Sequence, residues 1–171
     1  KESGITTFML KHEIDTGDVI ERRRVEITDT DTAGTLHDKL MEVGRDAVLS
    51  TVEKIASGNY EAIPQEVLTD GELRPAPKIF KEDCRVDWSN NGEHIALLIR
   101  GLSPYPAAWT PLYNSEGVEM GSIKIFKAEF KAGGGFAVGE IAADEKRLEI
   151  GCANGRISVE ELQMAGKRRM A

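Results

Sequence analysis

Apolar and polar residues follow a two-residue period in two runs near the start of the chain. Residues 4–10 are rich in β-branched and apolar side chains, and in residues 19–27 the apolar positions alternate with charges. Both patterns predict β-strands, and the second predicts a half-buried or edge strand. After the cap-forming residues 28–32, apolar residues recur at helical spacing, which predicts a helix from about Thr35 to Ser57, stopped by Gly58. The predicted apolar stripe comprises Leu36, Leu40, Val43, Ala47 and Ile55, widened by Val48 and Val52.

Residues 58–79 show no sustained period. They contain Pro64, Pro75 and Pro77, whose spacing blocks both a continuous helix and a central strand. A connection of this length without regular structure is typical of a domain boundary. We therefore expect a first domain over 1–57, a linker over 58–79 and a second domain over 80–171.

The second half of the chain is dominated by short alternating runs. A short helix is predicted at 93–101, followed by strands at 107–113, 122–130, 136–141, 147–152 and 156–162. Glycine-containing turns separate these runs, including Gly133–Gly135, which lacks the context of a phosphate-binding loop. This spacing predicts a small antiparallel barrel or sandwich. The whole chain is thus predicted to be an α/β segment followed by an all-β, barrel-like domain.

Composition narrows the classes of function. The chain has 171 residues, 40% hydrophobic content and a net charge of −7, so no overall basic field indicates a nucleic-acid partner, although a local basic patch remains compatible. No apolar run approaches the roughly 20 residues of a membrane span. The two cysteines, Cys84 and Cys152, lie far apart and form no metal-binding spacing, which favours reduced intracellular thiols.

An acidic turn at residues 13–18 is the main candidate for chemistry, with Asp15 at its centre. A carboxylate on a turn between two strands can orient a histidine or move a proton. The alternative is that Asp15 only caps its turn, since Asp-Thr-Gly is ordinary turn chemistry. Basic residues offer a second candidate. The arginines at 22–24 are interpreted as a solvated strand edge. The basic residues near the end, with Lys124 and Lys127, are a candidate contact for phosphates.

Several blocks in the sequence resemble the methionyl-tRNA formyltransferases, and they occur in the order found in that family. They are Gly4–Met9, Ile14–Asp18, Asp31–Leu40, Arg85–Trp88, Ile99–Trp109 and Leu162–Met170. The Asp-x-Gly turn is shared with folate-dependent formyltransferases in general, whereas the later blocks single out the tRNA enzymes. The resemblance implies a Rossmann-like formyltransferase domain followed by an OB-like barrel that binds tRNA.

It also implies a reaction and a site. A formyl group would pass from 10-formyltetrahydrofolate to the amino group of initiator methionyl-tRNA, with Asp15 as the catalytic aspartate and no metal. Glu13, Ile14, Asp15 and Gly17 would border the folate. The residues expected to contact tRNA are Arg74, Lys78, Lys81, Lys124, Lys127, Lys167, Arg168 and Arg169. The family context further implies a cytoplasmic, monomeric enzyme without a DNA or membrane partner.

The sequence departs from the family at its ends. The asparagine and histidine that work with the catalytic aspartate lie upstream of the Gly4 strand in the family, and His12 matches no catalytic position. Helix-forming residues expected after Met170 are absent as well. The chain thus resembles the C-terminal portion of the enzyme, and we expect it to be inactive alone. Two alternatives are a formyltransferase for an amino sugar and a non-catalytic RNA-binding β-barrel module.

Overall fold

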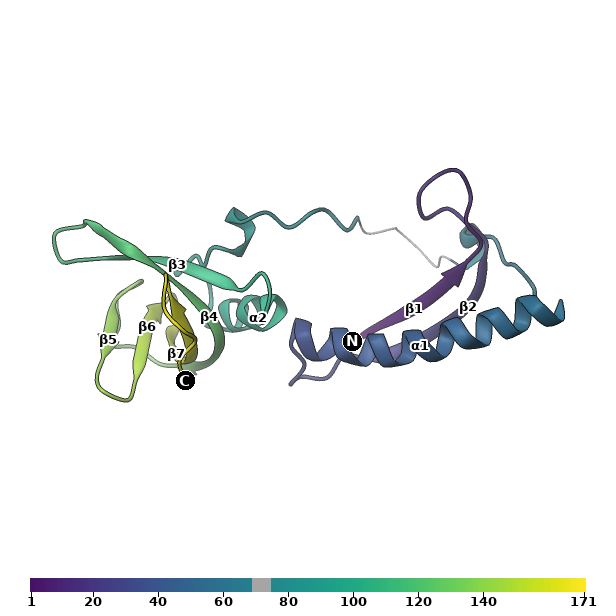
Figure 1. Ribbon diagram of the computed structural model, residues 1–171. Coiled ribbons are helices and arrows are strands. Elements are labelled where there is room, and N and C mark those ends of the chain that lie inside the picture. Colours follow the sequence, from purple (N-terminus) through teal and green to yellow (C-terminus); the bar gives the residue numbers. More distant parts are fainter. Residues whose placement is uncertain (69–74) are drawn as a thin grey trace. The chain divides into compact units, whose positions relative to one another are not determined.

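The computed structural model describes residues 1–68 and 75–171, and it forms two compact units. The first unit consists of Lys1–Asp31 and Thr35–Pro77, and the second of Thr32–Gly34 and Lys78–Ala171. Figure 1 shows their elements. In order, these are β1 (Glu2–Phe8), β2 (Val19–Glu26), α1 (Ala33–Ser57), η1 (Gln65–Leu68), η2 (Glu82–Cys84), α2 (Gly92–Leu102), β3 (Ala108–Tyr113), β4 (Glu119–Ala132), β5 (Ile141–Ala143), β6 (Leu148–Cys152) and β7 (Gly155–Met164).

The first unit is an antiparallel hairpin against which one long helix lies (Figure 1). The register of β1 and β2 runs from Glu2 opposite Glu26 to Phe8 opposite Val19. The predicted strands and helix are therefore confirmed, with β1 beginning two residues earlier than expected. The predicted helix stop is also confirmed, because Gly58 has φ +66°, a left-handed conformation that costs glycine little.

Two carboxylates tie α1 to its surroundings. Asp31 is buried just before the helix, where it accepts hydrogen bonds from Thr28 N at 2.7 Å and Lys39 Nζ at 2.7 Å. Glu21 on β2 accepts from Lys54 Nζ at 2.7 Å and Ser50 Oγ at 2.8 Å on the helix. These donors, Lys54 first, lower the pKa of Glu21 to about 2. The predicted cap region is thus confirmed as the place where the helix begins.

The apolar stripe of α1 divides between two faces, and this corrects the predicted pattern. Ala47 is buried toward the hairpin, together with Thr51, whose hydroxyl lies 2.8 Å from that of Thr7. In contrast, Val48, Val52 and Ile55 are exposed. A helical period identifies apolar positions but does not say which of two faces a neighbouring element covers.

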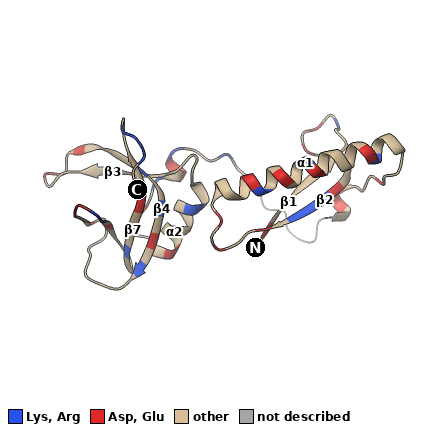
Figure 2. Cartoon of the chain, turned by 60° about the horizontal axis from the view of Figure 1, so that its bottom comes forward, with Lys and Arg blue, Asp and Glu red and all other residues tan. Residues whose placement is uncertain are grey.

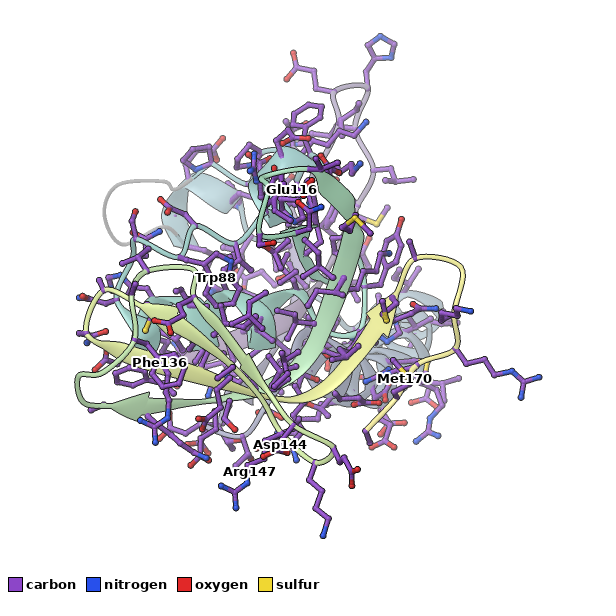
Figure 3. All side chains as sticks on the ribbon, turned by 90° about the vertical axis from the view of Figure 1, so that its left-hand side faces the viewer. Trp88, Glu116, Phe136, Asp144, Arg147 and Met170 are labelled. Carbon is purple, nitrogen blue, oxygen red and sulfur yellow. The ribbon has the colours of Figure 1, made fainter. Side chains whose placement is uncertain are left out.

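The second unit is a curled antiparallel sheet with α2 against it. The strand order is β3-β4-β7-β6-β5, and all the neighbouring pairs are antiparallel. Register shifts in the middle of β4, between Ile125 and Ala128, bend this long strand so that it can pair with β3 at one end and β7 along its length. Figure 3 shows Trp88 among these strands, with Glu116, Asp144 and Arg147 at the hairpin turns.

Isoleucines form the centre of this unit. The largest fully buried side chains are Ile95, Ile99, Ile125, Ile150 and Ile157. The helix approaches the sheet closely at Gly92, because a Cβ there would lie 1.9 Å from a ring carbon of Phe130. A side chain at position 92 would collide with the Phe130 ring, so glycine at the start of α2 allows the helix to lie close to the sheet.

Two expectations are wrong. Residues 136–141 do not form the predicted strand, because the Ala137 N–H bonds to the Glu140 side chain and Gly139 takes φ +78°, which makes a turn instead. The joint also contains regular structure, since Ile63 pairs with Val19 and η1 follows it. Both errors concern contacts between segments, which local propensity does not register.

No helix among the described residues is long and apolar enough to cross a membrane.

Candidate functional site

The acidic turn between β1 and β2 has a fixed backbone. Met9 N donates to Asp18 O at 3.0 Å, and Thr16 Oγ1 donates to Glu13 O at 3.0 Å. Gly17 is buried, and a Cβ at this position would lie 1.5 Å from Met9 O. The glycine of the Asp-x-Gly sequence is therefore required by a close backbone contact across the turn.

A residue from the joint holds the same turn from outside. Gln65 Nε2 donates to Asp15 O at 2.7 Å and to Gly17 O at 2.8 Å. This residue was not among the predicted site residues. A single glutamine in a proline-containing segment carries no local signal, and only the return of the chain past β2 brings it to the turn. Gln65 thus holds the carbonyl groups of Asp15 and Gly17, the two residues that flank Thr16.

The side chain of Asp15 is left exposed by this arrangement. Asp15 takes φ +57°, a left-handed conformation that aspartate tolerates better than most residues. Glu13 is exposed as well, and Ile14 is 89% exposed. The turn therefore offers a carboxylate and an apolar side chain on a rigid backbone, which suits a group that orients a partner side chain or borders a planar ligand.

The predicted partners of this carboxylate are not supplied by the described part of the chain. His12 is exposed just before the turn, His37 lies beside Asp38 on α1, and His94 is on α2 in the second unit. Within residues 1–68 and 75–171, no group of three His, Cys, Asp or Glu side chains could hold a metal ion.

The basic residues near the end are not a free tail. Met170 exchanges backbone hydrogen bonds with Leu162 at 2.8 and 2.9 Å, so the end of the chain folds back along β7. Arg169 pairs with Glu161 and lies 4.0 Å from the ring centroid of Phe126. Its guanidinium is thus engaged within the fold, whereas Lys167 and Arg168 are exposed and have no ion pair with any described residue.

The other predicted cations lie in different settings. Lys127 forms an ion pair with Glu160 at 2.7 Å, which raises the lysine pKa. Lys78 and Lys81 lie over the rings of Phe80 and Trp109 respectively. Lys124 donates to Pro106 O at 3.3 Å. Arg74 lies outside the described residues.

The arginines at 22–24 bind mostly within their own hairpin. Arg23 pairs with Glu21 at 2.6 Å, and Arg24 pairs with Glu2 at 3.4 Å. Figure 2 shows this basic segment on β2 and both signs of charge along α1.

Among the cations predicted to contact tRNA, Lys81 and Lys124 line the same pocket in the second unit. The described members of the set do not all gather into one patch.

Family models match both parts of the chain described above, the first unit with its acidic turn and the second unit with its curled sheet. Residues 78–171 match the family described as formyl transferase, C-terminal domain, and residues 1–52 match formyl transferase. The chain belongs to the formyl transferase family.

Among individual relatives, a methionyl-tRNA formyltransferase from Phocaeicola vulgatus is 50% identical over 99% of this chain and 53% of its own length. The chain thus spans about half the length of the curated relatives it matches. Among solved structures, HypX from Aquifex aeolicus in complex with tetrahydrofolic acid matches with a TM-score of 0.70 at 22% identity, over 99% of this chain and 29% of that one. A methionyl-tRNA formyltransferase from Clostridium thermocellum matches with a TM-score of 0.52 at 20% identity, over 88% of this chain and 56% of that one. These two structures support the fold.

Proposed function

We propose that this chain contributes to the transfer of a formyl group from 10-formyltetrahydrofolate to the amino group of initiator methionyl-tRNA. The observation that carries the proposal is the likeness to the Phocaeicola vulgatus relative across nearly the whole chain. In this reaction the amine nitrogen bonds to the formyl carbon, and the bond from that carbon to the folate nitrogen breaks. The proton lost by the amine ends on the folate nitrogen.

Asp15 is the proposed catalytic carboxylate. Its turn is fixed by Gln65 while its side chain stays exposed, which supports a role in orienting a histidine that takes the amine proton. Glu13, Ile14 and Gly17 would border the folate, and exposed Ile14 supplies the apolar contact that a flat ring system favours. The proposed organisation is a Rossmann-like catalytic part over 1–57, a linker over 58–79 and an OB-like tRNA-binding domain over 80–171. The proposed setting is a cytoplasmic, monomeric enzyme.

The experiment has two arms. The 171-residue chain alone is assayed for formyl transfer to methionyl-tRNA, and we expect turnover no greater than background. In a complete enzyme that contains this chain, Asp15→Asn should lower kcat by about 10²–10⁴-fold, because it removes a group that directs proton transfer. Asp38→Asn, which changes an equally exposed carboxylate on α1, is the matched control and should retain activity. Full activity in Asp15→Asn, or turnover by the chain alone, would contradict the assignment.

Lys167 and Arg168 are the proposed phosphate contacts at the end of the chain. Because neither is paired with a described residue, both are available to a polyanion, whereas Arg169 and Lys127 are occupied. Replacing Lys167 and Arg168 with alanine should weaken tRNA binding and reduce the slope of log affinity against log salt by about one to two. Lys146→Ala, on the β5–β6 turn, is the control. Equal slopes in the two variants would remove this pair from the interface.

The two alternative functions have less support. An amino-sugar formyltransferase would share the fold and the acidic turn, but the relative that matches nearly the whole chain is named for a tRNA substrate. A non-catalytic RNA-binding barrel does not account for the match of residues 1–52 to formyl transferase. Neither alternative is favoured by a particular contact in the chain.

A further inference from the structure

The second unit contains an aromatic pocket whose lining includes neither Asp15 nor Lys167, Arg168 or Arg169. It has a volume of about 340 Å³, within the range typical of ligand sites. Three segments surround it: the residues leading into η2, the proline corner before β3, and the facing positions of β3 and β4. The residues used below are Phe80, Lys81, Tyr105, Trp109 and Lys124.

Trp109 forms a fixed wall of this pocket. Its indole Nε1–H donates to Lys81 O at 2.8 Å, and its backbone carbonyl accepts from Val86 N at 2.9 Å. The Lys81 ammonium lies 4.9 Å from the ring centroid. The ring is therefore held in place before any ligand arrives, which lowers the entropy cost of stacking against it.

The two other aromatic side chains are exposed to solvent. Phe80 is 61% exposed and Tyr105 is 83% exposed, although both rings line a concave site. Aromatic rings exposed together around a pocket are unusual on a surface that has no binding role. Phe80 is also positioned from its backbone, because its N–H donates to Asp83 Oδ2 at 2.7 Å.

Cations complete the pocket. Lys81 and Lys124 both line it, and neither forms an ion pair with any described residue. Lys124 Nζ instead donates to the Pro106 carbonyl at 3.3 Å, which places its ammonium group beside the aromatic walls. On a chain with net charge −7, two lysines that form no ion pair with a described residue and line one aromatic pocket favour a ligand that combines a flat ring with negative charge.

We propose that this pocket binds one unpaired nucleotide of the RNA substrate, with its base stacked among Phe80, Tyr105 and Trp109 and its phosphates near Lys81 and Lys124. The proposal deepens the proposed function and rests on it for the identity of the RNA. Bases in a helix are already stacked and cannot enter a pocket, whereas loops and single-stranded ends present bases that can. Stacking on aromatic side chains beside lysines is how proteins bind single strands without reading their sequence.

The test uses the chain with a fluorescently labelled single-stranded oligoadenylate and a duplex of equal length. Phe80→Leu and Tyr105→Leu keep an apolar side chain but remove the ring, and each should weaken single-strand binding about tenfold without changing its salt dependence. Lys124→Gln should lower the salt slope by about one. Tyr113→Leu, an exposed aromatic at the far end of β3, and Lys146→Gln are the matched controls. Circular dichroism confirms that each variant is folded.

The outcomes separate this proposal from the proposed function. Ring-dependent binding of the single strand together with weak duplex binding supports the pocket, even if the complete enzyme then proves not to formylate methionyl-tRNA. Binding that is unchanged in both ring variants, equal losses in Tyr113→Leu, or an absence of single-strand binding by the unaltered chain would overturn the pocket. Formyl transfer by the complete enzyme would stand in each of those cases.

Discussion

The two units of the chain are stabilised by different kinds of interaction. The second unit has a core of fully buried isoleucines drawn from α2 and three strands. Among the described residues of the first unit, the buried apolar side chains are the small or medium Val19, Val25 and Ala47, and two carboxylates with little exposure bind lysines. The stability contributed by apolar burial does not depend on pH, whereas the stability contributed by ionised carboxylates is lost in acid. The two units should therefore respond differently to cavities, to crowding of the backbone and to acid.

The candidate sites follow the same division. The acidic turn of the first unit is held by backbone hydrogen bonds and leaves its carboxylate exposed. The pocket of the second unit is formed by aromatic side chains on the outside of an apolar core. The acidic turn suits a carboxylate that orients a partner side chain, and the pocket suits the stacking of a ring from a ligand.

The largest effect is expected from a cavity in the second unit. Ile125→Ala removes a fully buried side chain, and it should lower the free energy of unfolding by about 3–4 kcal/mol. Both tryptophans of the chain, Trp88 and Trp109, lie in this unit, so their fluorescence during urea unfolding reports it. Ile141→Ala, at a partly exposed position on β5, is the control and should cost less than about 1 kcal/mol. An equal loss of unfolding free energy in the two variants would show that the isoleucine core is not the main source of stability in the second unit.

A smaller effect is expected from the backbone contact in the acidic turn. Gly17→Ala would place a methyl group 1.5 Å from Met9 O, so the turn must shift, at a cost of about 2–3 kcal/mol to the first unit. The control is Gly44→Ala in α1, where the nearest atom is 3.7 Å away and alanine should be neutral or stabilising. Unfolding of both variants is followed by the helical circular dichroism signal, to which α1, the longer helix, contributes most. A Gly17→Ala variant as stable as Gly44→Ala would contradict the close contact.

The smallest effect depends on pH and should appear only in the first unit. The pKa of Glu21 is lowered from 4.5 to about 2, so its contribution to stability is complete above pH 4.5 and is lost as the pH falls toward 2. Glu21→Gln should therefore cost about 1–2 kcal/mol at pH 7 and little near pH 2. Thermal unfolding followed by circular dichroism at the two pH values measures this difference. Glu53→Gln, at an exposed position of α1, is the control and should cost little stability. A cost of Glu21→Gln that does not change with pH would contradict the network around Glu21.

Much of the local structure was predictable because it depends on short-range pattern. The strands at 2–8 and 19–26, the helix that ends at Ser57, and most strands of the second half follow alternation, caps and glycine stops. The failures have a common cause. The turn at Gly139, the pairing of Ile63 with Val19 and the two faces of α1 all depend on which distant segment lies beside them.

The candidate site divides in the same way. Sequence reasoning placed Asp15 at the centre of its turn and identified the family, because both rest on residue types in a fixed order. It did not find Gln65, which reaches the turn only after the chain returns past β2. It also treated Arg169 like Lys167 and Arg168, although the last strand pairing brings Arg169 to Glu161 and Phe126.

The sequence by itself determined the elements, the acidic turn and the family, since alternation, caps and short motifs act over a few neighbouring residues. Only the tertiary structure decided which lysines form ion pairs, which glutamine holds the Asp15 turn and which rings line one pocket. Those features depend on hydrogen bonds and packing between residues as far apart as Lys81, Tyr105 and Lys124, whose proximity is set by the curl of the sheet.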